Sequence, residues 1–175
     1  MTEPRPTYVL DANAFMQARR DFYPFDVCPG YWDALIWHGQ GRGLCSIDRV
    51  AAEIQRGKDD LWQWAEERFG KDRFVSTDDS GVIQWFGEMA NWVQAQPQFL
   101  DYAKEEFAGE EEADGWLAAY AKSIANGVVV TLEKFDPMVK KKVPLPNVCK
   151  AFDVDCITPF EMLRRLQVRL NWQPA

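Results

Sequence analysis

Four acidic residues stand where short apolar runs end or where neighbouring helices begin. Asp11 directly follows the apolar residues 8–10 in "YVLDANAF", and Glu133 closes the run in "VVVTLEKFDP". Glu53 lies about one and a half turns into the helix expected after a second apolar run, and Asp114 begins the helix expected before "VVVT". Converging carboxylates repel one another, and Mg²⁺ or Mn²⁺, which prefers oxygen ligands, relieves that repulsion. Because such an ion activates water and holds phosphate oxygens, the chemistry expected is phosphodiester hydrolysis.

Each of these acids also has a structural interpretation. Asp11 could cap the first helix, and Asp114 could complement a helix dipole. Glu53 could belong to a solvated helix face, and Glu133 could belong to a turn. In open parallel sheets, however, ligands bind beyond the carboxyl ends of the strands. One topology would bring all four acids to that edge, which favours the functional interpretation.

The elements that must position these residues are short strands alternating with helices. Runs rich in Val, Ile and Leu predict buried parallel strands at 8–10, 44–47 and 128–131, with a weaker candidate at 154–157. Helical periods with readable ends predict helices at 29–41, at 48–57, before Asn126-Gly127, and from Pro159 onward with Thr158 as N-cap. Residues 61–107 are expected to form further helices whose aromatic side chains serve packing. This alternation predicts an α/β fold with about four to five parallel strands between helices, in a single domain over 1–175.

Length, net charge and the numbers of cysteine and histidine residues restrict the kinds of protein and of site that the chain can form. With 175 residues and a hydrophobic fraction of 47%, the chain can form a packed core without disulfides, and its four cysteines form no Cys-x-x-Cys pair. The net charge of −7 argues against a broad basic face for duplex DNA. A lone histidine, His38, excludes a His-rich zinc site and is expected at a helix end. With no leader-like start and no long apolar run, we expect a cytoplasmic chain without a membrane partner.

The order of the acidic segments resembles that of the PIN domain (VapC-like) ribonucleases. In both, the chain runs through stretches like "YVLDANAF", "SIDRVAAEI", "EEEADGWLAAYA" and "VVVTLEKF" in turn. The chain resembles most a bacterial PIN-like family filed as a domain of unknown function, which also shows stretches like "FDVCPGYWDAL" and "CITPFEMLRRL". The resemblance covers nearly the whole chain. It implies a PIN-like parallel sheet and a Mg²⁺- or Mn²⁺-dependent endoribonuclease.

The resemblance also implies roles for individual residues. Asp11, Glu53 and Asp114 would bind the metal directly, and Asn13 and Thr131 would orient these ligands or fix the loop. Glu133 stands where PIN domains often have Asp, so its longer side chain favours a water-mediated role in catalysis.

RNA and a protein partner are the expected partners. Lys140, Lys141 and Lys142 follow Glu133 closely and could neutralise RNA phosphates, as could Arg49. A solvated loop is the alternative interpretation of the three lysines. PIN toxins are held by a cognate antitoxin, and a homodimer is conceivable from family analogy and from the eight tryptophans.

Two other functions are open to the same sequence. A catalytically silent PIN-like module could bind a protein partner through its aromatic surface. A haloacid-dehalogenase-like phosphatase is disfavoured, because Asn13 stands where that family has its second Asp.

Overall fold

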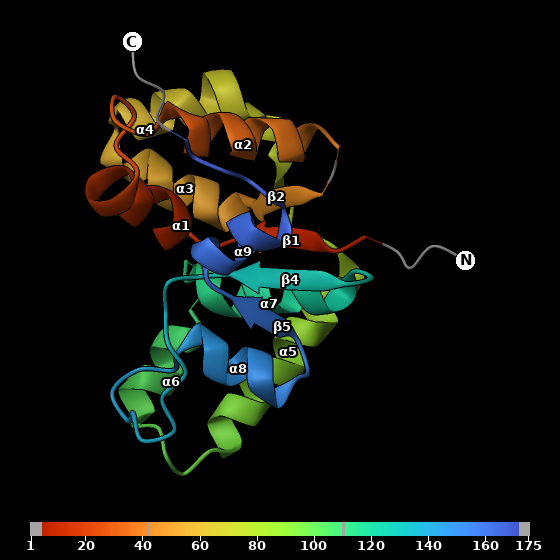
Figure 1. The fold of residues 1–175 in the computed structure, drawn as a ribbon. Helices are drawn as coiled ribbons and strands as arrows, with labels where there is room; N and C mark the ends of the chain where they lie inside the picture. The colour runs from red at the N-terminus through yellow and green to blue at the C-terminus, as the bar shows by residue number, and fades with distance from the viewer. Residues whose placement is uncertain (1–4, 42, 110, 172–175) are drawn as a thin grey trace.

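The computed structural model describes residues 5–41, 43–109 and 111–171 and has the expected α/β architecture. Its sheet contains five strands, all parallel, in the order β3-β2-β1-β4-β5 (Figure 1). The strands are β1 (Thr7–Leu10), β2 (Leu44–Ile47), β3 (Phe74–Val75), β4 (Gly127–Val130) and β5 (Asp155–Ile157).

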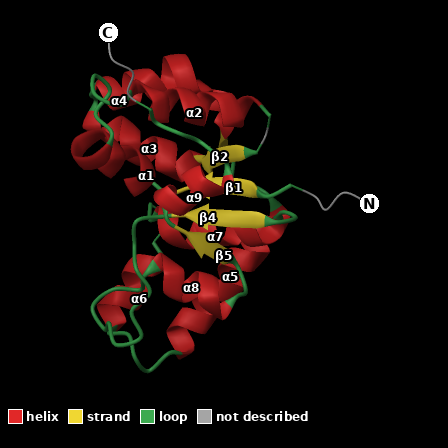
Figure 2. Cartoon of the chain, viewed as in Figure 1, coloured by secondary structure: helices red, strands yellow, loops and turns green. Residues whose placement is uncertain are grey.

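Helices cover the sheet on both sides. Figures 1 and 2 show one group, α1 to α4, beyond the β2 side of the sheet and a second group, α5 to α8, beyond the β5 side. The helices are α1 (Asn13–Gln17), η1 (Ala18–Phe22), α2 (Pro29–Gln40), α3 (Asp48–Gly57), α4 (Asp60–Trp64), η2 (Ala65–Gly70), η3 (Lys71–Arg73), α5 (Ser80–Ala95), α6 (Asp101–Phe107), α7 (Ala113–Ser123), α8 (Leu145–Ala151) and α9 (Pro159–Arg165). None of those lying within the described ranges has both the length and the hydrophobicity that a bilayer span requires.

The strand order reverses between β1 and β4. The chain runs outward from β1 through β2 to β3, then returns to place β4 and β5 on the other side of β1. Leu10 pairs with Val130, so the carboxyl ends of β1 and β4 lie side by side. Such a reversal opens a crevice beyond the strand ends, which is where open α/β sheets bind ligands.

The two central strands are buried because their side chains are almost all apolar. Val9, Leu10, Val129 and Val130 are fully buried, as expected for a parallel sheet covered on both faces. At Gly127, which begins β4, an added Cβ would lie 2.1 Å from a backbone carbonyl oxygen of α7, so only glycine allows α7 and β4 to approach so closely.

The expected N-cap of the last helix is present, whereas one strand was missed. The Thr158 side chain accepts a hydrogen bond from the Glu161 amide at 3.2 Å, as the sequence predicted. The strand β3 lies within the stretch expected to be helical, where it pairs with Ser46 and Ile47. Two residues are too short to show the alternation that identifies a strand.

Candidate functional site

Asp11 is anchored at the carboxyl end of β1. Its amide donates a hydrogen bond to the Val130 carbonyl at 2.9 Å, and its side chain is almost fully buried, with 4% of the residue exposed. Its Oδ1 accepts from the Ala12 amide at 2.6 Å. Its Oδ2 accepts from Asn13 Nδ2 at 2.6 Å and from the Thr131 hydroxyl at 2.7 Å. These donors fix the orientation of the carboxylate.

Asn13 and Thr131 join the loop after β1 to the loop after β4. Asn13 Nδ2 also donates to Thr131 Oγ1 at 3.0 Å, and its Oδ1 accepts from the Leu132 amide at 2.9 Å. Thr131 Oγ1 accepts a further bond from the Glu133 amide at 3.1 Å. The Thr131 hydroxyl therefore donates its one hydrogen to Asp11 and accepts hydrogen bonds from Asn13 and from the Glu133 amide. Both residues therefore donate hydrogen bonds to Asp11, and their role in orienting a metal ligand stays a prediction.

Both oxygens of the Glu133 carboxylate are engaged by the loop that follows it. Oε1 is in contact with the ammonium of Lys142, and Oε2 accepts from the Leu145 amide at 2.9 Å. The Glu133 side chain is only 17% exposed. In this structure Glu133 closes the loop and holds Lys142.

Asp114 reaches the site through the first turn of α7, whose start lies at the carboxyl edge of the sheet. At the next residue, Gly115, an added Cβ would lie 2.8 Å from the rings of Phe86 and Phe107. The absence of a side chain there lets α7 begin against α5 and α6, and this packing sets the position of Asp114. A carboxylate in the first turn also suits the helix dipole.

Burial and mutual repulsion raise the pKa values of three acids in the group. Burial raises the pKa of Asp11 to about 6, and the charges of Glu133 and Glu53 add to the rise, against the hydrogen bonds from Thr131 and Ala12. Burial also raises the pKa of Asp114 well above its usual value, with further contributions from Asp11 and Glu133. The pKa of Glu53 is raised by burial and by Glu112. The charges of Glu133 and Glu53 thus act on Asp11, and those of Asp11 and Glu133 act on Asp114.

The chemistry of these donors fits a hard divalent cation. Their oxygens are the ligands that Mg²⁺ and Mn²⁺ prefer. The half-buried carboxylates of Asp114 and Glu53 supply such oxygens beside Asp11. Within the described ranges, no three His, Cys, Asp or Glu side chains are arranged closely enough to hold a metal ion. The donors are thus gathered at one edge without forming a closed coordination cage.

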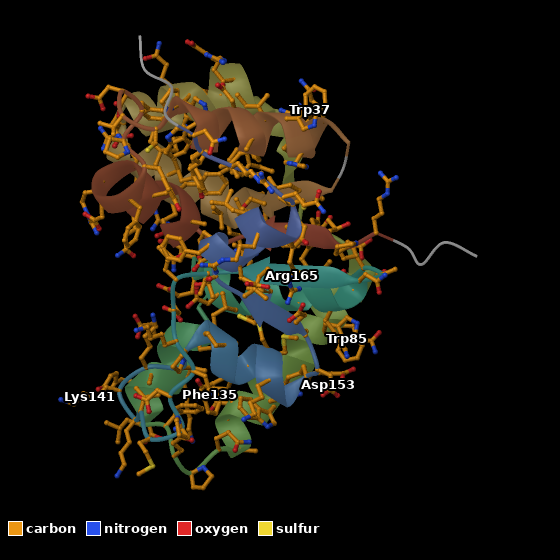
Figure 3. The ribbon with its side chains drawn as sticks, viewed as in Figure 1. Trp37, Trp85, Phe135, Lys141, Asp153 and Arg165 are labelled. Carbon is orange, nitrogen blue, oxygen red and sulfur yellow. The ribbon has the colours of Figure 1, made fainter. Side chains whose placement is uncertain are left out.

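The predicted RNA-binding residues lie in three different environments. Lys140 and Lys141 are exposed, and Figure 3 shows Lys141 extending outward from the loop beside α6. Lys142 is also exposed, and its ammonium contacts Glu133. Arg49 is half-buried, with its guanidinium 4.0 Å from the centre of the Trp116 ring, so its clearest contact is a packing contact.

One acid of the site was missed, and one lysine makes a contact that was not predicted. Glu112 adds a further negative charge beside Glu53 and Asp114, and the acidic run "EEEAD" was the available signal. Lys142 was expected to face RNA, and nothing in the sequence distinguishes it from Lys140 and Lys141. Both residues line a cavity of about 150 Å³ that also borders Asp114.

Comparison with known proteins gives one match. A family model described as "Domain of unknown function (DUF4411)" matches residues 8–170. No curated protein and no solved structure matches the chain.

Proposed function

We propose that this chain, which belongs to the family described as "Domain of unknown function (DUF4411)", is a Mg²⁺- or Mn²⁺-dependent ribonuclease. One observation supports the proposal most strongly. Buried Asp11 and its acidic neighbours gather at the strand-order reversal, with pKa values raised by burial and by each other. Clustered carboxylates with perturbed pKa values in such a crevice are typical of functional sites.

The proposed roles follow from the contacts. Asp11, Asp114 and Glu53 would hold the cation, and Asn13 and Thr131 would keep Asp11 in one orientation through their hydrogen bonds. A bound divalent ion would supply charge neutralisation at the phosphate and a more acidic water for its hydrolysis.

RNA is favoured as the substrate by local charge. The chain carries a net charge of −7, yet the exposed Lys140 and Lys141 lie on the same loop as Lys142, which reaches the acidic group. A short basic segment of this kind suits one strand better than a long duplex. The resemblance to PIN toxins extends the proposal to a toxin held by an antitoxin protein.

The test of this proposal is cleavage of a labelled RNA by the metal-stripped protein, with and without added Mn²⁺. We expect cleavage only with Mn²⁺ and at least a hundredfold slower cleavage by Asp11→Ala, on the order of the loss when a metal site is disrupted. Asp26→Ala is the matched control, because Asp26 is an exposed acid in the loop before α2. Undiminished cleavage by Asp11→Ala would refute the site.

A second candidate is a catalytically silent binding module. It is favoured by the pairing of Lys142 with Glu133, which supplies a positive charge to the acidic group without a metal. An exposed aromatic residue such as Trp37, 72% exposed, would then serve a protein partner (Figure 3). Calorimetry separates the two functions, because only the enzyme requires Mn²⁺ binding that is lost in Asp114→Asn.

A further inference from the structure

Lys142 supplies a positive charge to the acidic group in this structure. Its ammonium contacts Glu133 Oε1. Lys142 also lines the cavity of about 150 Å³ that borders Asp114 and Glu112. One lysine therefore lies among acids from the loop after β4 and from the start of α7.

We propose that Lys142 is a tethered counter-cation, which neutralises the carboxylates in the metal-free protein and is displaced when a divalent cation binds. The inference rests on the proposed function, because it takes Asp11, Asp114 and Glu53 as the metal ligands. It adds that a side chain of the protein, Lys142, competes with the metal ion for the acidic group.

Charge sets the two states in competition. An ammonium and a divalent ion repel each other at contact distances, and solvent screens that repulsion only in part, because Glu133 is 17% exposed. The charge of Lys142 partly neutralises these acids, so a divalent cation can take its place only if the ammonium moves away. Binding of the metal is therefore weakened by the free energy of the Lys142 contacts.

The surroundings allow Lys142 to move without unfolding the loop. Its side chain is 53% exposed and has a flexible four-carbon stem. It also borders the cavity of about 150 Å³, whose lining includes the carboxylates of Glu106 and Glu112 as alternative partners. The backbone is held separately, because the Leu145 amide donates to Glu133 Oε2 and the Leu100 amide donates to the Lys140 carbonyl.

The alternative is that the Lys142 contact only fastens the loop. Under that alternative, removal of the charge leaves the affinity for metal unchanged or lowers it, because a loosened loop presents its acids less well. A tethered competitor has the opposite effect.

The deciding experiment is calorimetric titration of Mn²⁺ into the metal-stripped full chain. Lys142→Met keeps the length of the side chain and removes its charge, and Lys141→Met is the matched control on the same loop. We expect Lys142→Met to bind Mn²⁺ up to about fivefold more tightly than the unmodified protein, which is the scale of losing one partly exposed ion pair. The control should bind within twofold of the unmodified protein.

Equal or weaker binding by Lys142→Met overturns the inference. If the unmodified protein binds Mn²⁺ and Asp114→Asn does not, that failure leaves the proposed function standing. If no form of the protein binds Mn²⁺, both fall together.

Thermal unfolding gives a second test that needs no catalysis. Metal-free Lys142→Met should melt below the unmodified protein, and saturating Mn²⁺ should close or reverse that gap through its tighter binding. A gap that persists unchanged in Mn²⁺ contradicts displacement. Circular dichroism checks that the variant is folded, and Lys142→Gln replaces it if it is not.

Discussion

The acidic group should make the metal-free protein less stable as the pH rises. Burial, with the charges of Glu133 and Glu53, raises the pKa of Asp11 from 3.8 to about 6 in the folded chain. Between these two values the folded state binds more protons than the unfolded state, so stability falls with increasing pH. The contribution is fully present below about pH 4 and is lost as the pH passes about 6.

The size of the effect follows from the shift. At about 1.4 kcal/mol per pKa unit, the rise at Asp11 corresponds to about 3 kcal/mol. For a chain of this length, that free energy is equivalent to roughly 6–12 °C in Tm.

The assay is urea unfolding in EDTA at a series of pH values from 4 to 8, for the unmodified protein and for Asp11→Asn. Asparagine preserves the shape of the side chain and does not titrate, so the difference between the two proteins reports Asp11 together with its electrostatic effect on Asp114. We expect the free energy of unfolding of the unmodified protein, relative to Asp11→Asn, to fall by about 3 kcal/mol across the series. A difference that stays constant, or that grows with pH, would refute the account of the site's electrostatics.

Two packing and hydrogen-bond predictions accompany it. Thr131→Val removes the hydroxyl that donates to Asp11 at 2.7 Å, and should cost about 1–3 kcal/mol in urea unfolding, whereas Thr131→Ser should keep most of that stability. Gly127→Ala places a Cβ 2.1 Å from the Ala121 carbonyl oxygen and should cost more than about 2 kcal/mol. Gly87→Ala, in α5 with no atom within 4 Å of its Cβ, should instead stabilise the chain by about 0.5–1 kcal/mol. Equal responses of the two glycines to alanine in thermal unfolding would contradict the close approach of α7 and β4.

The sequence predicted the parts of the fold that depend on short-range patterns. The valine-rich runs identified the central strands, and the polar residue ending each run placed Asp11 and Thr131 at one edge. This works because parallel strands joined by right-handed crossovers must align their carboxyl ends. Strand β3 was missed, since its two residues carry too little pattern and depend on pairing with β2.

The arrangement of charge within the site was harder to predict. Lys140, Lys141 and Lys142 are equivalent in the sequence, and only the path of the loop places the Lys142 ammonium on Glu133. Arg49, likewise, stays a prediction for RNA, and its contact with Trp116 depends on how α3 and α7 meet. Long side chains have many rotamers, so their partners are decided by tertiary packing rather than by local sequence.

Diffraction from Mn²⁺-soaked crystals, with anomalous difference maps, tests the central claim most directly. The account predicts an anomalous peak within ligand distance of the carboxylates of Asp11 and Asp114, with Glu53 drawn toward it and the Lys142 ammonium moved away. Saturating Mn²⁺ with no peak at that edge of the sheet, or with Lys142 still seated on Glu133 beside a peak elsewhere, would contradict it.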